Sequence, residues 1–125
     1  MAKTKPLPVA ERAFQANELL RNLNPQFRAS QLALLLAVYR QEGQMMRDLA
    51  IETDLTMSGL SRCFDNLSSS GRTDKKGYPM DLLRAERGRD DRVLLIYLTG
   101  RGRQLIEAYL SILEEIGRAS CRERV

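Results

Sequence analysis

The chain has 125 residues, of which 43% are hydrophobic and 29% charged, and it carries a formal net charge of +4. This length supports one hydrophobic core but not two full domains, and the positive balance favours an anionic partner. The sequence contains no histidine and only two cysteines, which excludes histidine-based zinc sites, histidine acid–base catalysis and a disulfide framework.

The N-terminal part of the chain predicts a loose arm and then an amphipathic helix. Residues 1–8 contain two lysines and two prolines and favour a flexible arm. From there, apolar residues recur at spacings of four and three along one stripe: Val9, Ala13, Ala16, Leu20 and Leu23. Asn24–Pro25 ends the helix, because the residue before a proline is disfavoured in the helical region. We expect the stripe to contact both its own domain and a second subunit.

The next segment predicts a buried central helix. Ser30 is expected to cap a helix that runs from Gln31 to Gln41 and is apolar on most of its faces, which is typical of a buried helix. Gly43 ends this helix. Gln44 and Met45 then predict a short extended strand.

Residues 46–71 organise the rest of the chain, because they predict two short helices joined by a tight turn. Thr56 can cap the second helix through its hydroxyl group. In that helix Leu60, Phe64 and Leu67 form one apolar stripe facing a core, with Cys63 beside it. The opposite face carries small polar groups and an arginine, which suits insertion into a DNA major groove. The alternative is an ordinary helical hairpin with a solvated face.

A β-hairpin and a final helix follow. Leu82–Glu86 and Arg92–Leu98 predict two strands around a charged tip. Thr99 can cap the last helix, whose broad apolar surface exceeds what a small domain usually buries and indicates a homodimer. That surface consists of Leu105, Ile106, Tyr109, Leu110, Ile112, Leu113 and Ile116. Residues 117–125 lose the periodicity and indicate a non-native or disordered tail, which leaves 9–116 as the folded domain.

This order of elements predicts a mainly α fold with a small β-hairpin wing, a winged helix-turn-helix. Three pieces between about residues 31 and 105 resemble the multiple antibiotic resistance regulator (MarR) family of bacterial transcription factors: DLA at 48–50, LTMSGLSR at 55–62 and DDRVLLIYLTGRG at 90–102. The resemblance implies a homodimeric regulator, here taken as a repressor, that binds double-stranded DNA at a pseudo-palindromic operator. In the homodimer we expect the first and last helices to make the contact, through Val9, Ala13, Ala16, Leu20, Leu23, Leu105, Tyr109, Ile112, Leu113 and Ile116.

The chain also departs from the family pattern. Thr53 stands where a hydrophobic residue is usual, and Asp54 where glycine is usual. The insert at 72–80 is longer than the usual link to the wing, and the flanking helices are short. We therefore expect a weak or absent response to the small anionic or phenolic effectors that act on relatives.

The candidate DNA-binding residues come from the second helix of the pair and from the hairpin. Ser58, Ser61 and Arg62 are expected to read bases, since arginine can address guanine through two acceptors. Arg89 is expected to reach a minor groove, while Arg92 pairs with Asp90 and shapes the tip. The full candidate set is Thr56, Met57, Ser58, Gly59, Ser61, Arg62, Arg87, Arg89 and Arg92.

The pattern does not support other chemistry. Asp90 and Asp91 are adjacent on a hairpin and point apart, so we expect no metal site, no cofactor and no enzymatic activity. Cys63 is expected to be a buried structural thiol rather than a redox sensor.

No apolar run approaches the length of a bilayer span, so we expect a cytoplasmic protein. Two alternatives stay open: a winged-helix protein-interaction module that does not bind DNA, and a replication or plasmid-maintenance protein that binds repeated DNA sites.

Overall fold

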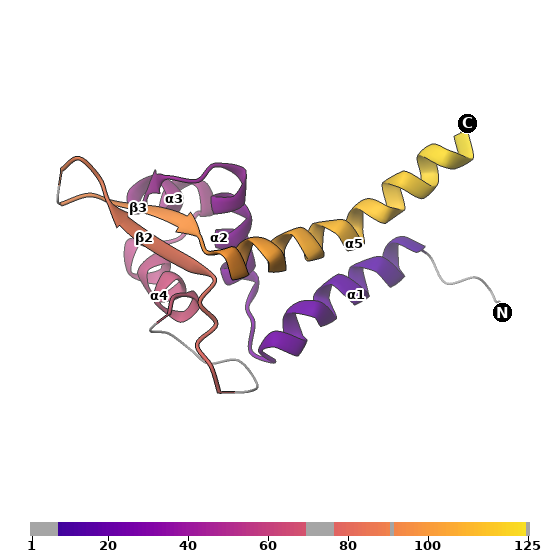
Figure 1. Cartoon of the computed structure of the whole chain (residues 1–125), viewed down its shortest axis with the longest axis horizontal. Helices are drawn as coiled ribbons and strands as arrows, with labels where there is room; N and C mark the ends of the chain where they lie inside the picture. Colours follow the sequence, from indigo (N-terminus) through magenta and orange to yellow (C-terminus); the bar gives the residue numbers. More distant parts are fainter. Residues whose placement is uncertain (1–7, 70–76, 91, 125) are drawn as a thin grey trace.

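The computed structural model describes residues 8–69, 77–90 and 92–124, with side chains as far as residue 114. Within these ranges the helices are α1 (Pro8–Leu23), α2 (Ala29–Arg40), α3 (Met46–Thr53), α4 (Met57–Leu67) and α5 (Gly100–Arg124). The strands are β1 (Gln44–Met45), β2 (Leu83–Arg87) and β3 (Leu94–Leu98). Figure 1 shows α2, α3 and α4 gathered against the β2–β3 hairpin, while α1 and α5 lie side by side and extend away from it. The predicted winged helix-turn-helix is confirmed.

The sheet is antiparallel in the order β1-β3-β2, which confirms the short strand predicted at Gln44 and Met45. In the hairpin, Leu83 pairs with Leu98 and Arg87 with Leu94. Both strands begin later than predicted. Leu82 donates its N–H to the carbonyl of Leu67 at the end of α4 instead of joining the ladder, at an N···O distance of 2.6 Å. At the tip, Gly88 bonds to the Val93 carbonyl, so the turn takes up residues that were assigned to the second strand.

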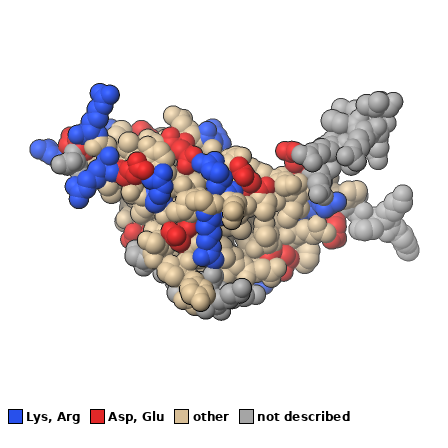
Figure 2. Space-filling view, viewed as in Figure 1, with Lys and Arg blue, Asp and Glu red and all other residues tan. Residues whose placement is uncertain are grey.

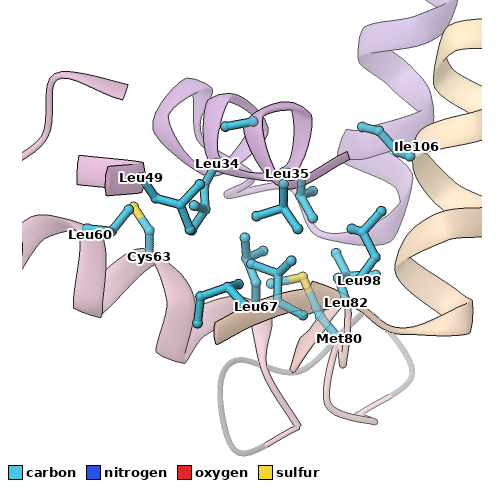
Figure 3. Close-up of a cluster of buried hydrophobic side chains, with 14 of the residues drawn as sticks. Leu34, Leu35, Leu49, Leu60, Cys63, Leu67, Met80, Leu82, Leu98 and Ile106 are labelled. Carbon is cyan, nitrogen blue, oxygen red and sulfur yellow. The ribbon is translucent and has the colours of Figure 1, made fainter. Parts of the chain in front are cut away.

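The core forms where α2 meets the helix-turn-helix and the sheet (Figure 3). Leu34 and Leu35 of α2, Leu60 of α4 and Ile96 of β3 are all essentially inaccessible to solvent. Each such side chain contributes roughly 1.5–3 kcal/mol relative to leaving it exposed. The predicted burial of the central helix is confirmed, and this core fixes the positions of α4 and the wing.

Helix α1 packs against α5 of the same chain, and only the C-terminal half of its apolar stripe is buried. Ala16 and Leu20 are buried, whereas Val9 and Phe14 are each 62% exposed. The helix begins at Pro8, which the sequence pattern assigned to the arm. Proline fits the first helical position because its missing N–H would have no intrahelical partner there.

The C-terminal boundary of the fold differs from the predicted one. Helix α5 continues to Arg124, past the predicted end of the fold at Ile116. The non-native origin proposed for 117–125 stays a prediction, and residues 1–7 lie outside the described ranges. Over the part of the chain that the structure describes, no helix combines the length and apolar character that a bilayer span requires.

The predicted caps are correct at two of three helices. Thr56 Oγ1 accepts the Gly59 N–H at 3.0 Å, and Thr99 Oγ1 accepts the Gly102 N–H at 2.9 Å. Ser30 is not a cap, because α2 begins at Ala29 and Arg28 precedes it as the N-cap residue. The Ser30 hydroxyl oxygen instead accepts a bond from the buried Cys63 thiol, at a donor–acceptor distance of 3.5 Å.

Candidate nucleic-acid interface

The turn between α3 and α4 sets the direction of α4, the helix proposed to read DNA. Asp54 adopts the left-handed conformation, with φ 59° and ψ 38°, and donates its N–H to the carbonyls of Ala50 and Ile51. Leu55 then donates its N–H to Ala50 at 3.0 Å, which closes the turn before Thr56 caps α4. Aspartate tolerates this conformation better than most residues that carry a Cβ. Asp54 can therefore replace the glycine usual at this position.

Helix α4 is anchored on one side and open on the other. Leu60, Cys63 and Leu67 are buried. The candidate reading residues Ser58, Ser61 and Arg62 are all exposed, as are Thr56 and Met57. The structure therefore leaves the polar face of α4 free to meet a duplex, as the sequence pattern indicated.

Gly59 is explained by the cap rather than by exposure alone. A Cβ at this position would lie 3.1 Å from the Thr56 hydroxyl oxygen, which accepts the Gly59 N–H. Any other residue would push that oxygen aside by a few tenths of an ångström. Tolerance of glycine on the open face of α4 is therefore an incomplete explanation, because the cap itself favours a residue without a side chain.

The wing presents exposed cations at its tip. Arg87, Arg89 and Arg92 are exposed, and Figure 2 shows blue side chains clustered at the hairpin end of the molecule. The expected contact between Arg92 and Asp90 forms through the main chain: the Arg92 N–H donates to Asp90 Oδ1 at 3.2 Å. The Arg92 side chain lines a shallow groove of about 330 Å³ together with Arg47 of α3. Arg92 thus shapes the tip and keeps its guanidinium available.

Most of the described arginines fall into a paired or an unpaired group. Four are ion-paired with glutamates: Arg21 with Glu18, Arg40 with Glu52, Arg84 with Glu86 and Arg103 with Glu42. Six others have no acidic or hydrogen-bonding side-chain partner within the described ranges: Arg28, Arg47, Arg62, Arg87, Arg89 and Arg92. Guanidinium groups that are not already paired can neutralise phosphates without first breaking an internal contact. The sequence pattern missed Arg28 and Arg47, because the absence of a partner becomes visible only when the elements are placed in space.

Glu42 holds the base of the wing to its neighbours. One carboxylate oxygen accepts the Leu98 N–H at 2.9 Å, and the other pairs with Arg103 of α5. Burial raises the pKa of Glu42, but the Leu98 N–H and the Arg103 guanidinium outweigh it and hold the pKa below its ordinary value of 4.5. The carboxylate is therefore charged at neutral pH and connects the end of α2, strand β3 and α5.

Arg84 also stacks on the Tyr97 ring, with its guanidinium carbon 4.8 Å from the ring centroid.

Comparisons with known proteins support this architecture. No family model and no curated protein matches the chain. Among solved structures, the Staphylococcus aureus MepR–DNA complex aligns over 92% of this chain and 83% of that chain, with 22% identity and a TM-score of 0.66. Reduced AbfR bound to DNA aligns over 85% and 70%, with 25% identity and a TM-score of 0.59. A MarR-family transcriptional regulator from Silicibacter pomeroyi aligns over 84% and 66%, with 22% identity and a TM-score of 0.57.

These structural neighbours are MarR-family regulators, and two of them are complexes with DNA. They are transcription regulators rather than enzymes. The chain has the fold that its sequence motifs predicted, and its structure resembles those of DNA-bound regulators.

Proposed function

We propose that this chain is a MarR-type transcription regulator that binds double-stranded DNA sequence-specifically as a homodimer and acts as a repressor in the cytoplasm. The observation that carries the proposal is the combination of an exposed polar face on α4 with unpaired arginines on α4 and the wing. Two exposed arginines outside these elements, Arg21 and Arg40, already have glutamate partners. The solved DNA complexes that share the fold support the same reading.

In this proposal α4 enters the major groove from its N-terminal end. Ser58, Ser61 and Arg62 contact base edges, and Thr56, Met57 and Gly59 bring the start of the helix close to the duplex. The wing lies along the neighbouring minor groove, where Arg89 is inserted. Arg87 and Arg92 neutralise phosphates, which strengthens binding without selecting a sequence.

The homodimer follows from surface that the single chain leaves uncovered. Val9 and Phe14 of α1 are exposed, and Leu110, Ile112 and Leu113 of α5 are only half-buried. A two-fold partner that covers these side chains would place two copies of α4 about one helical turn of DNA apart. The matching operator is a pseudo-palindrome.

The proposal is tested by selecting bound sites from random duplex DNA and measuring mobility shifts at low and moderate salt. We expect enrichment of one inverted repeat and weaker, strongly salt-dependent binding to random duplex. Failure to shift any duplex at any salt concentration would favour the protein-interaction module instead. Enrichment of tandem direct repeats would favour the replication or plasmid-maintenance role. A promoter–reporter fusion carrying the selected site then separates repression from activation.

A further inference from the structure

A polar cavity of about 350 Å³ lies between the start of α2 and the side of α4. Its walls include Arg28 and Gln31 from the start of α2, and Gly59, Arg62 and Asn66 from α4. Two of these five residues carry guanidinium groups, and no carboxylate lines the cavity among the described residues. Its chemistry therefore favours a ligand that accepts hydrogen bonds and carries negative charge.

Gln31 supplies a donor that is not used inside the protein. The residue is only 3% exposed, and its Oε1 accepts the Arg28 main-chain N–H at 2.9 Å. Because the oxygen of the carboxamide accepts this bond, the other terminal atom of the side chain is the donor Nε2. No described residue accepts a bond from Nε2, and the side chain lines the cavity. Among the described residues every fully buried side-chain nitrogen or oxygen has a hydrogen-bond partner, so Nε2 reaches solvent through the cavity, where water or a ligand can accept its bond.

The charges around the cavity also favour a negatively charged ligand. Arg28 and Arg62 are exposed and have no acidic partner within the described ranges. The first turn of α2 carries no acidic residue, so the partial positive charge of the helix start is not offset locally. Arginine forms bidentate hydrogen bonds with phosphate, which places charge and donors together.

We propose that this cavity binds a phosphate of the DNA backbone beside the recognition helix, with Arg28 and Gln31 as donors. The inference rests on the proposed function. A backbone phosphate is favoured over a free anion because Gly59 and Arg62 belong both to the cavity wall and to the α4 surface that would meet DNA. A duplex seated on α4 brings its phosphates to the cavity mouth. Arg28 then anchors the duplex on the side of α4 that faces α2.

The first test compares Arg28→Ala with Arg40→Ala, since Arg28 is the N-cap residue of α2 and Arg40 is the last residue of the same helix, where it is paired with Glu52. Binding to the selected duplex is measured by fluorescence anisotropy over a salt series. We expect Arg28→Ala to weaken binding roughly tenfold and to reduce the salt slope by about 0.9. Arg40→Ala should change neither quantity. Gln31→Glu keeps an acceptor for the Arg28 N–H but places negative charge in the cavity, so it should also weaken binding, with thermal unfolding as the check on folding.

The second test locates the phosphate. Duplexes in which a single phosphate is replaced by a neutral methylphosphonate are scanned across one half-site. At one position, the methylphosphonate should lower the affinity of the wild-type protein for the duplex but leave the affinity of Arg28→Ala unchanged. Equal affinities and slopes for Arg28→Ala and Arg40→Ala, in a protein that binds DNA, would overturn the inference and leave the proposed function intact.

Two further outcomes would also overturn the inference. No binding of the wild-type protein to any duplex would refute the proposed function and the inference with it. Calorimetric titration with inorganic phosphate alone distinguishes a free anion from the backbone. Tight phosphate binding that Arg28→Ala abolishes, without any effect of that variant on DNA affinity, would assign the cavity to a free anion.

Discussion

A Cβ on Gly102 would lie 2.0 Å from the carbonyl oxygen of Leu82 and 2.9 Å from its carbonyl carbon. The same carbonyl accepts the Thr99 N–H at 3.0 Å, and the Thr99 hydroxyl caps the first turn of α5 through Gly102. The start of α5 therefore lies directly against the residue that leads into β2. This contact explains why the last residue of the segment DDRVLLIYLTGRG, Gly102, has to be glycine.

Gly102→Ala should therefore destabilise the fold by about 3 kcal/mol, the upper end of the usual range for overpacking, because the clash is with backbone that a rotamer change cannot relieve. Gly100→Ala is the matched control, since a Cβ there meets nothing within 4 Å. The control should change stability by less than about 1 kcal/mol. Denaturant unfolding followed by circular dichroism compares the two variants, and similar midpoints for both would contradict the packing described here.

Asp54→Gly should stabilise the protein by about 0.5–1 kcal/mol, because Asp54 has a left-handed backbone with φ 59° that glycine adopts without a Cβ penalty. Asp54→Val should do the reverse, since a β-branched residue is strongly disfavoured there. Chemical denaturation of both variants checks the order. A loss of stability in Asp54→Gly would show that the aspartate side chain contributes more than its backbone conformation costs.

The lowered pKa of Glu42 predicts a pH dependence of stability. A carboxyl group with a folded pKa below its unfolded value of 4.5 stabilises the protein above that value. This contribution is lost as the pH falls below 4.5 and through the folded pKa. Urea midpoints measured between neutral pH and the onset of acid unfolding should fall less steeply for Glu42→Gln than for the wild type. Parallel curves would mean that other carboxyl groups control the acid transition.

Arg62→Ala and Arg89→Ala should affect DNA binding in different ways. If Arg62 contacts a base edge, its loss should cost about 1–3 kcal/mol on the selected site and relax preference at one position per half-site. Arg89→Ala should weaken specific and random duplexes more evenly and make the salt dependence shallower by about one unit of slope. Titrations of both variants against both duplexes over a salt series separate the effects. Equal losses on the two duplexes for Arg62→Ala would assign Arg62 to phosphate and leave base reading to Ser58 and Ser61.

The proposed homodimer predicts a two-chain mass in dilute light scattering. Phe14→Glu places a charge on a side chain that is 62% exposed on α1 and should shift the mass towards one chain. The same variant should weaken operator binding, because one half-site is then released. Gln15→Glu is a control for added charge on the same helix, since Gln15 is also exposed but has a polar side chain. A wild-type protein that has a one-chain mass, both free and with DNA, would contradict the prediction.

The local elements of this protein could be predicted from the sequence because their signals are short-range. Apolar periodicity identified the α4 stripe of Leu60 and Leu67, and the hydroxyls of Thr56 and Thr99 marked the starts of two helices. The predictions erred where a distant contact competes with a local signal. Leu82 bonds to Leu67 instead of extending β2, and the proposed cap Ser30 lies inside α2 and contacts Cys63.

Only the tertiary structure decided which charged groups are paired, because pairing depends on residues that are far apart in the chain. Glu42 and Arg103 are separated by 61 residues, yet they meet at the base of the wing. The same packing leaves Arg28 and Arg62 without acidic partners in the described ranges and brings them to one cavity wall. The sequence by itself determined the winged helix-turn-helix through hydrophobic spacing and helix caps. The arrangement of cations available to DNA depends on how α2, α4 and the wing pack together.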